Sequence, residues 1–205
     1  MGGVRIRPSV QGGFKYILYK TVSYVVYLLS FLTFSLTSTA HADSAEGRWL
    51  LIDTDRLTLQ VMQAGQAELT LQNIAIGRFG TSIDKRRADN TTPLGRYRIT
   101  KIERDSSFHR FISLDYPGIE QAEAAFREGD IAQREYQAIL RAHRAGRMPP
   151  QDTALGGHVG IHGLGQGDPH WHETLNWTRG CIALTNAQID TLLSWVRAGM
   201  MVEIR

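Results

Sequence analysis

Cys181 is the only cysteine of the chain, and it lies in a segment, residues 157–184, that also contains four of the seven histidines. A cysteine is a useful nucleophile only as the thiolate, which a neighbouring imidazole can generate by accepting the thiol proton. His162 ends an apolar, alternating run, residues 159–162, that is typical of a strand and would deliver its ring to a cleft. The two residues therefore predict a cysteine nucleophile with a histidine base.

The residues around Cys181 are suited to hold a reacting carbonyl close to the backbone. Gly180 precedes the cysteine, and a glycine lets backbone N–H groups approach such a carbonyl. Residues 182–184 are apolar and would anchor the loop in the core. A single cysteine cannot form an internal disulfide, so in an exported protein its use as a nucleophile is favoured over an inert buried thiol.

These motifs resemble the active-site signature of the L,D-transpeptidase family, also called the YkuD-type catalytic domain. The signature is a His–Gly pair, here His162 and Gly163, a spacer of about fifteen residues, and Ser/Thr-x-Gly-Cys-Ile, here residues 178–182. Residues 92–97, Thr-Pro-Leu-Gly-Arg-Tyr, resemble the Thr-Pro-x-Gly-x-aromatic turn of the same family. The resemblance covers roughly residues 47–205.

The resemblance implies acyl transfer through a thioester, without a cofactor or a metal. Cys181 would attack the carbonyl of the third residue of a peptidoglycan stem peptide, a diamino acid, and release the terminal D-alanine. His162 would act as the base, the Gly163 carbonyl would orient its other ring nitrogen, and the N–H groups of Cys181 and Gly180 would stabilise the oxyanion. The thioester would then pass to an amine, giving a 3-3 cross-link or protein attachment, or to water.

Three residues are candidates for substrate binding. Many family members carry an arginine two residues after the cysteine, whereas this chain has Ala183. Arg179 is the candidate for part of that arginine's contact with a substrate carboxylate. Thr178 and Trp171 are the others, Trp171 either stacking on substrate or covering the core. Residues 85–87, Lys-Arg-Arg, would meet peptide carboxylates or form a solvated basic loop.

Three alternatives remain open. Residues 114–117 and 176–178 resemble a subgroup that includes a hydrolase releasing a lipoprotein from the wall, so hydrolysis, including L,D-carboxypeptidase activity, rivals transfer. A zinc hydrolase is a second alternative, because His158 and His162 are four residues apart, His170 and His172 are two apart, and Cys181 is near in sequence. His158 and His162 lie on a Gly-rich strand pattern without an adjacent glutamate, which does not fit the helical zinc motif. The third alternative is an inactive wall-binding module.

Residues 1–42 have the pattern of a secretory signal. They contain four basic residues and no acidic one, then an apolar run over about residues 22–36, then Ala-His-Ala at 40–42. Cleavage before Asp43 is predicted, with an uncleaved anchor as the alternative, so the catalytic part is expected in the periplasm or cell envelope and meets a membrane only through this segment. The formal charge of +3 includes four leader charges, which leaves −1 for residues 43–205 and does not indicate nucleic-acid binding.

The remaining pattern predicts one mainly β catalytic domain over residues 43–205. Strands are expected at residues 48–53, 57–62, 69–76, 97–102 and 111–116, with a last strand near 202–204 that closes the sheet. With the family resemblance, the expected fold is a YkuD-type mixed sheet, sandwich-like or barrel-like.

Helices are expected in two places. A helical pair at about 118–147, divided at Gly129 and with Asp130 as the second N-cap, would be an insertion that walls or covers the cleft or only packs beside it. Residues 185–188, Thr-Asn-Ala-Gln, fit a capping box that begins a C-terminal helix directly after the catalytic loop.

Overall fold

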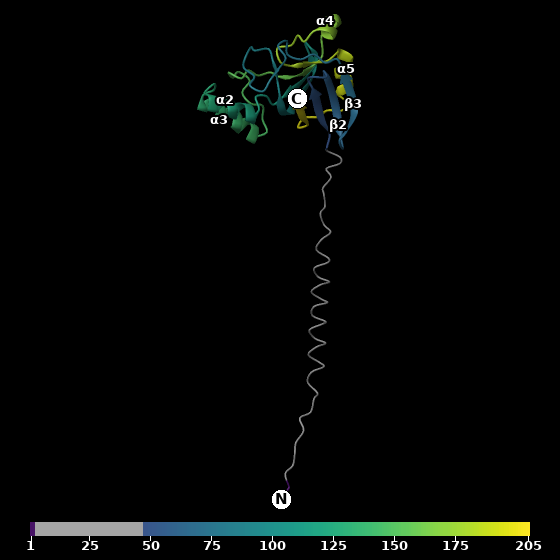
Figure 1. The fold of residues 1–205 in the computed structure, drawn as a ribbon. Coiled ribbons are helices and arrows are strands. Elements are labelled where there is room, and N and C mark those ends of the chain that lie inside the picture. Colours follow the sequence, from purple (N-terminus) through teal and green to yellow (C-terminus); the bar gives the residue numbers. More distant parts are fainter. Residues whose placement is uncertain (3–46) are drawn as a thin grey trace. The chain divides into compact units, whose positions relative to one another are not determined.

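Residues 47–205 form a mixed sheet of eight strands (Figure 1). The computed structural model describes residues 1–2 and 47–205, so the predicted signal segment lies almost wholly outside the described residues. The strands follow the order β3-β2-β1-β10-β6-β7-β8-β9 across the sheet. Their bounds are β1 Trp49–Asp53, β2 Thr58–Gln63, β3 Gln66–Gln72, β6 Gly95–Ser106, β7 His109–Leu114, β8 Gly160–His162, β9 Ile182–Ala183 and β10 Met201–Ile204. The predicted mainly β fold with a mixed sheet is confirmed.

The first three strands form an antiparallel meander, in which β1 is buried continuously from Leu50 to Asp53 and β2 buries the alternate residues Leu59 and Val61. β1 pairs with β2 from Trp49 opposite Met62 to Asp53 opposite Thr58, and β2 pairs with β3. The predicted end of the strand at residues 69–76 was wrong. β3 stops at Gln72, and Asn73 has a left-handed φ of 56°. This residue turns the chain, and the following segment runs beside the catalytic loop instead, with Ala75 bridged to Ala183.

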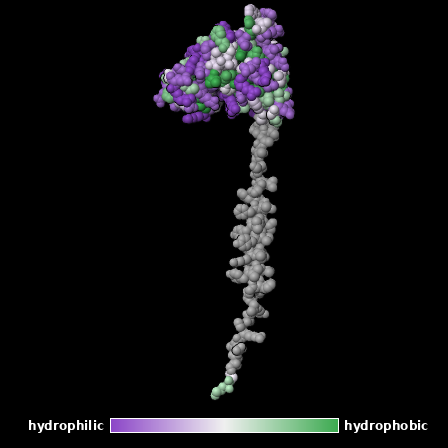
Figure 2. Space-filling view, viewed as in Figure 1, coloured by the Kyte–Doolittle hydropathy of each residue, from purple (hydrophilic) through white to green (hydrophobic). Residues whose placement is uncertain are grey.

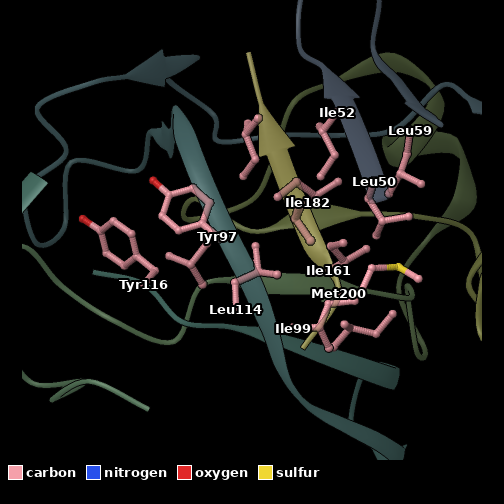
Figure 3. Packing of buried hydrophobic residues seen from close by; sticks show 14 of the residues in the cluster. Leu50, Ile52, Leu59, Tyr97, Ile99, Leu114, Tyr116, Ile161, Ile182 and Met200 are labelled. Carbon is pink, nitrogen blue, oxygen red and sulfur yellow. The ribbon is translucent and has the colours of Figure 1, made fainter. Parts of the chain in front are cut away.

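The C-terminal strand β10 lies inside the sheet, between β1 and β6, and not at an edge. It is parallel to β1 and antiparallel to β6, and its Val202 and Ile204 are buried. In Figure 3 side chains from β1 and β6 share one core with Ile161 of β8 and Ile182 of β9. Full burial of each such aliphatic side chain contributes about 1.5–3 kcal/mol. β8, which ends at His162, and β9, which follows Cys181, are thereby fixed to the main core.

The helical insertion consists of α2 (Ile119–Glu128) and α3 (Gln133–Arg144), which pack together on the side of the sheet away from β2 and β3 (Figure 1). Gly129 ends α2 in a left-handed conformation, as predicted. The prediction that Asp130 caps α3 was wrong, since the N-cap is Ala132 and no side chain caps this end. Asp130 instead forms an ion pair with Arg86, which ties the helical pair to the loop before β6.

Two shorter helices flank the catalytic loop, α4 (Pro169–Thr174) before it and α5 (Asn186–Leu192) after it. The predicted capping box of α5 is present: the Gln188 N–H donates to Thr185 Oγ1 at 3.1 Å, and the Thr185 N–H donates to Gln188 Oε1 at 2.9 Å. Because α5 begins just beyond β9, this cap fixes the chain immediately after the nucleophile.

In the loop before β6, β4 (Thr81–Ser82) and β5 (Thr92–Pro93) form a short parallel pair.

The surface of the domain is largely polar. Polar residues dominate the face seen in Figure 2, with hydrophobic residues in scattered patches. Within the residues that the structure describes, no helix has the length and apolar character needed to span a membrane.

Candidate active site

Cys181 and His162 line the same open cavity, whose volume is about 780 Å³. His162 is the last residue of β8, and Cys181 directly precedes β9. These strands are parallel neighbours, with His162 opposite Ala183 in the register. The predicted nucleophile and base are therefore presented from adjacent strand ends into one cavity.

The His162 ring is buried, with 3% of the residue exposed, and its orientation is set by the backbone. Nδ1 lies 2.7 Å from the carbonyl oxygen of Gly163, which is the hydrogen bond that the family resemblance implies. Because a carbonyl can only accept, Nδ1 carries the proton and Nε2 has the lone pair of a base. Burial lowers the pKa of His162 although the Gly163 hydrogen bond opposes this shift, so the imidazole is neutral at neutral pH.

Three aromatic rings, none of them predicted from the sequence as site residues, surround His162. Phe111 stacks on the imidazole at 5.8 Å with the planes 6° apart, Phe108 lies at 4.3 Å, and Trp177 meets it edge-on at 5.8 Å. Phe111 lies opposite His162 in the β7–β8 register, a long-range pairing that local patterns do not encode. Trp177 was detectable, because it immediately precedes the Thr-Arg-Gly-Cys motif.

The Cys181 thiol is protonated at rest. Sγ donates a hydrogen bond to the His158 carbonyl oxygen at 3.4 Å, and His158 has a left-handed φ of 56°. Burial raises the pKa of the Cys181 thiol to about 11, against smaller lowering effects of the Gly160 backbone and the Lys85 charge. The resting pair is therefore a neutral thiol and a neutral imidazole, and the thiolate has to be generated by proton transfer.

Thr178 holds the loop that carries Cys181. Its hydroxyl donates to the Cys181 carbonyl at 2.7 Å and accepts from the Gly180 N–H at 3.1 Å, and the residue is buried. These bonds place Thr178 in the loop framework; because Thr178 also lines the cavity, its predicted substrate contact stays a prediction. They also occupy the Gly180 N–H, one of the two predicted oxyanion donors. Between residues 47 and 205, no group accepts a hydrogen bond from the Cys181 N–H, so that donor remains available.

Only glycine fits at position 180. Its φ is 128°, and a Cβ there would lie 2.6 Å from the Thr91 carbonyl oxygen. Any larger residue would clash with backbone and would also be strained by the positive φ. The glycine of the motif is thus required by the packing of the loop against residues 85–92, a contact that the sequence analysis did not predict.

Of the residues predicted to bind substrate, some line the cavity and one does not. Arg179 is exposed and lines the catalytic cavity together with Arg78, which the sequence analysis missed. Both arginines also line an adjoining hollow of about 540 Å³. Trp171 on α4 is 59% exposed and lines neither hollow. The aromatic side chains that line the catalytic cavity are Trp177, Phe108 and Phe111.

Ala183 has no room for the arginine that many family members carry at this position. It is fully buried in β9, and its backbone exchanges two hydrogen bonds with Ala75, at 2.8 and 3.0 Å. The arginines that line the cavity are Arg78 and Arg179.

Each residue of the basic run at 85–87 has an acidic partner, and Lys85 and Arg87 also line the adjoining hollow, where Arg87 is exposed. Lys85 pairs with Asp89, Arg86 with Glu128 of α2, and Arg87 with Asp152. Through Arg86 the run connects the helical insertion to the loop before β6. Neither α2 nor α3 contributes a residue to the two hollows, so the expectation that these helices wall or cover the cleft was wrong.

The zinc alternative lacks a ligand set in the part of the chain that the structure describes, where no three His, Cys, Asp or Glu side chains gather closely enough to hold a metal ion. Two further histidines, His109 and His143, make contacts within the protein. His109 Nε2 lies 2.8 Å from Asp190 Oδ2, and His143 Nε2 lies 2.8 Å from the Pro117 carbonyl oxygen.

The sequence matches the YkuD family, described as L,D-transpeptidase catalytic domain, over residues 47–204. No curated protein sequence matches it significantly. Similar solved structures include the helical cell shape determining protein Pgp2 from Campylobacter jejuni, with 17% identity and a TM-score of 0.51 over 77% of this chain and 47% of that one. Bd1075 from Bdellovibrio bacteriovorus is 15% identical, with a TM-score of 0.49 over 77% and 47%. The chain thus spans about half the length of these proteins, and the likeness to Pgp2 shows the fold.

Proposed function

The chain belongs to the L,D-transpeptidase catalytic domain family, and we propose that it is an exported cysteine acyltransferase that acts on peptidoglycan stem peptides. It forms a thioester between Cys181 and the third stem-peptide residue and transfers this acyl group to an amine or to water. The observation that carries the proposal is the pair of Cys181 and His162 in one cavity, with the His162 ring fixed by Gly163.

The first step of the proposed reaction starts from the neutral pair. His162 Nε2 accepts the thiol proton while Sγ forms a bond to the stem-peptide carbonyl carbon, and the Cys181 N–H stabilises the oxyanion. The C–N bond to the terminal D-alanine then breaks, and His162 returns the proton to the leaving amine. The products are the Cys181 thioester and free D-alanine.

The second step uses the same base in the opposite direction. His162 accepts a proton from the attacking amine or water as it bonds to the thioester carbon, and the proton then passes to Sγ as the C–S bond breaks. An amine of a second stem peptide gives a 3-3 cross-link, and a protein amine gives attachment of a protein such as a lipoprotein. Water gives a shortened stem peptide or, with a protein-linked wall as substrate, release of the protein.

Substrate carboxylates are proposed to bind at the mouth shared by the two hollows. Arg78 and Arg179 line both hollows, and guanidinium groups bind carboxylates through paired hydrogen bonds. Trp177, at the wall beside His162, offers an apolar surface to the peptide. The proposed export of the protein to the periplasm or envelope, where this substrate lies, rests on the signal pattern of residues 1–42.

Product analysis tests the function. Residues 43–205, as wild type and as Cys181→Ala, are incubated with purified disaccharide-tetrapeptides, and the products are identified by mass. Cys181-dependent loss of D-alanine with a cross-linked dimer supports transfer to an amine, and loss without dimer supports hydrolysis. A wild type that alters neither this substrate nor a lipoprotein-linked wall contradicts the proposal and leaves a binding module.

A further inference from the structure

Lys85 is a buried lysine next to the loop that carries the nucleophile. It lies between β4 and β5, and only 4% of the residue is exposed. Lysine is almost never buried without a partner, because removing an ammonium from water is costly. The buried ammonium of Lys85 therefore needs a partner, and its burial needs a structural or chemical explanation.

Asp89 supplies the partner and fixes the ammonium. Lys85 Nζ lies 2.6 Å from Asp89 Oδ1, and the same carboxylate accepts from the backbone N–H groups of Arg86 at 2.6 Å and Thr91 at 3.0 Å. Burial of Asp89 acts against ionisation, yet the Lys85 hydrogen bond and these backbone bonds lower its pKa overall. The lysine is thus held by an ionised carboxylate that is itself locked to the loop backbone.

The far end of the Lys85 side chain packs directly against the catalytic loop. A Cβ at Gly180 would lie 3.2 Å from both Cε and Nζ of Lys85, so these atoms occupy the space beside the Gly180 backbone. The next residue is the nucleophile. The charge of Lys85 also acts to lower the pKa of Cys181, against the larger effect of burial.

We propose that Lys85 is a positioning residue for Cys181, whose buried ammonium fixes the backbone of Gly180 and favours negative charge on the sulfur and on the oxyanion. This inference rests on the proposed role of Cys181 as nucleophile. A nearby cation has a particular use here, because Thr178 occupies the Gly180 N–H and the Cys181 N–H alone remains of the predicted oxyanion donors. The competing explanation is that Lys85 only neutralises Asp89.

The test measures the thiol itself, independently of any peptidoglycan substrate. The rate of Cys181 alkylation by iodoacetamide is followed by mass spectrometry across pH for the wild type, Lys85→Met, Lys85→Gln, Lys85→Arg and Lys101→Met. Lys101 is the matched control, since it is an exposed lysine of β6 that pairs with Glu103. Lys85→Gln keeps a hydrogen-bond donor for Asp89 without the charge, and it serves if Lys85→Met does not fold.

In Lys85→Met and Lys85→Gln we expect the thiol to titrate about one pH unit higher, so that alkylation at a fixed pH near neutrality slows about 10-fold. Lys85→Arg and Lys101→Met should follow the wild type. On the tetrapeptide substrate, kcat should fall in the uncharged variants with little change in KM. A folded Lys85→Met or Lys85→Gln with the wild-type alkylation profile would overturn the proposal, even if turnover were reduced. A shifted profile in an enzyme without turnover would support Lys85 while contradicting the proposed function.

Discussion

Nδ1 of His162 lies 2.7 Å from the carbonyl oxygen of Gly163, so the base is oriented by the backbone of the next residue and not by a carboxylate. A neutral carbonyl fixes the tautomer but stabilises an imidazolium less than an anionic partner would. The buried ring and its aromatic neighbours reinforce this preference for the neutral form. The site therefore rests as an uncharged pair and forms charge only when substrate reacts.

The pH dependence of turnover follows from this arrangement. Because the pKa of His162 is lowered from 6.5, its imidazole stays neutral as pH falls to 6.5, and kcat/KM should decline only at lower pH as the base becomes protonated. The thiol pKa of about 11 predicts no thiol titration near its ordinary value of 9.0. A kcat/KM profile on the free enzyme checks both limbs. An acid limb centred above 6.5 would contradict a neutral, buried base.

Thr178→Val tests the loop framework. Valine has nearly the same shape but loses both hydrogen bonds to the loop, those with the Cys181 carbonyl and the Gly180 N–H. Misplacement of the nucleophile should lower kcat about 10- to 100-fold, and stability should fall by about 1–3 kcal/mol because buried backbone groups lose their partner. Steady-state kinetics and urea unfolding measure the two effects. Thr178→Ser keeps the hydroxyl and should stay near wild type, and an equal loss in both variants would argue against the hydrogen bonds as the cause.

The sequence was informative where chemistry and local structure coincide. Cys181 and His162, which local motifs identified, line one cavity, and the predicted α5 capping box is present. The Gly163 hydrogen bond, which the family resemblance implied, is also present. Contacts between distant segments could not be predicted from local sequence patterns. The packing of Lys85 on Gly180 and the pairing of Phe111 with His162 each join residues far apart in the chain.

Two local predictions failed for identifiable physical reasons. Asp130 is of a residue type that often caps helices, but its carboxylate pairs with Arg86 of another loop, so a tertiary contact overrides the local preference. The strand predicted to extend to residue 76 ends at Gln72, because Asn73 tolerates the left-handed conformation that redirects the chain toward β9.

Thr185→Ala tests the cap that fixes the chain beyond the nucleophile. The variant loses the hydroxyl oxygen that accepts from the Gln188 N–H, while the backbone N–H of residue 185 can still donate to Gln188 Oε1. This loss should destabilise the domain by about 1 kcal/mol. The midpoint of urea unfolding, at constant m-value, measures this loss. Thr185→Ser retains the hydroxyl oxygen and is the matched control, and a serine variant as unstable as the alanine variant would show that the hydroxyl bond is not responsible.

Removal of residues 201–205 should prevent folding. β10 separates β1 from β6, so its loss breaks the sheet into two parts and exposes the core around Val202 and Ile204. Circular dichroism and thermal unfolding of the truncated chain measure the outcome. Glu203→Gln, which keeps the strand and weakens only a partly exposed ion pair with Arg96 at 3.6 Å, should unfold near the wild-type temperature. A cooperative, near-wild-type transition in the truncated chain would contradict the central placement of β10.

The most direct test of the account is the intact mass of the protein during reaction with a disaccharide-tetrapeptide. The wild type should gain the mass of the substrate less D-alanine, and peptide mapping should place this adduct on Cys181. Cys181→Ala should gain nothing, and His162→Gln should form the adduct far more slowly. Turnover that persists in Cys181→Ala, or an adduct on another residue, would contradict the assignment of Cys181 as the nucleophile.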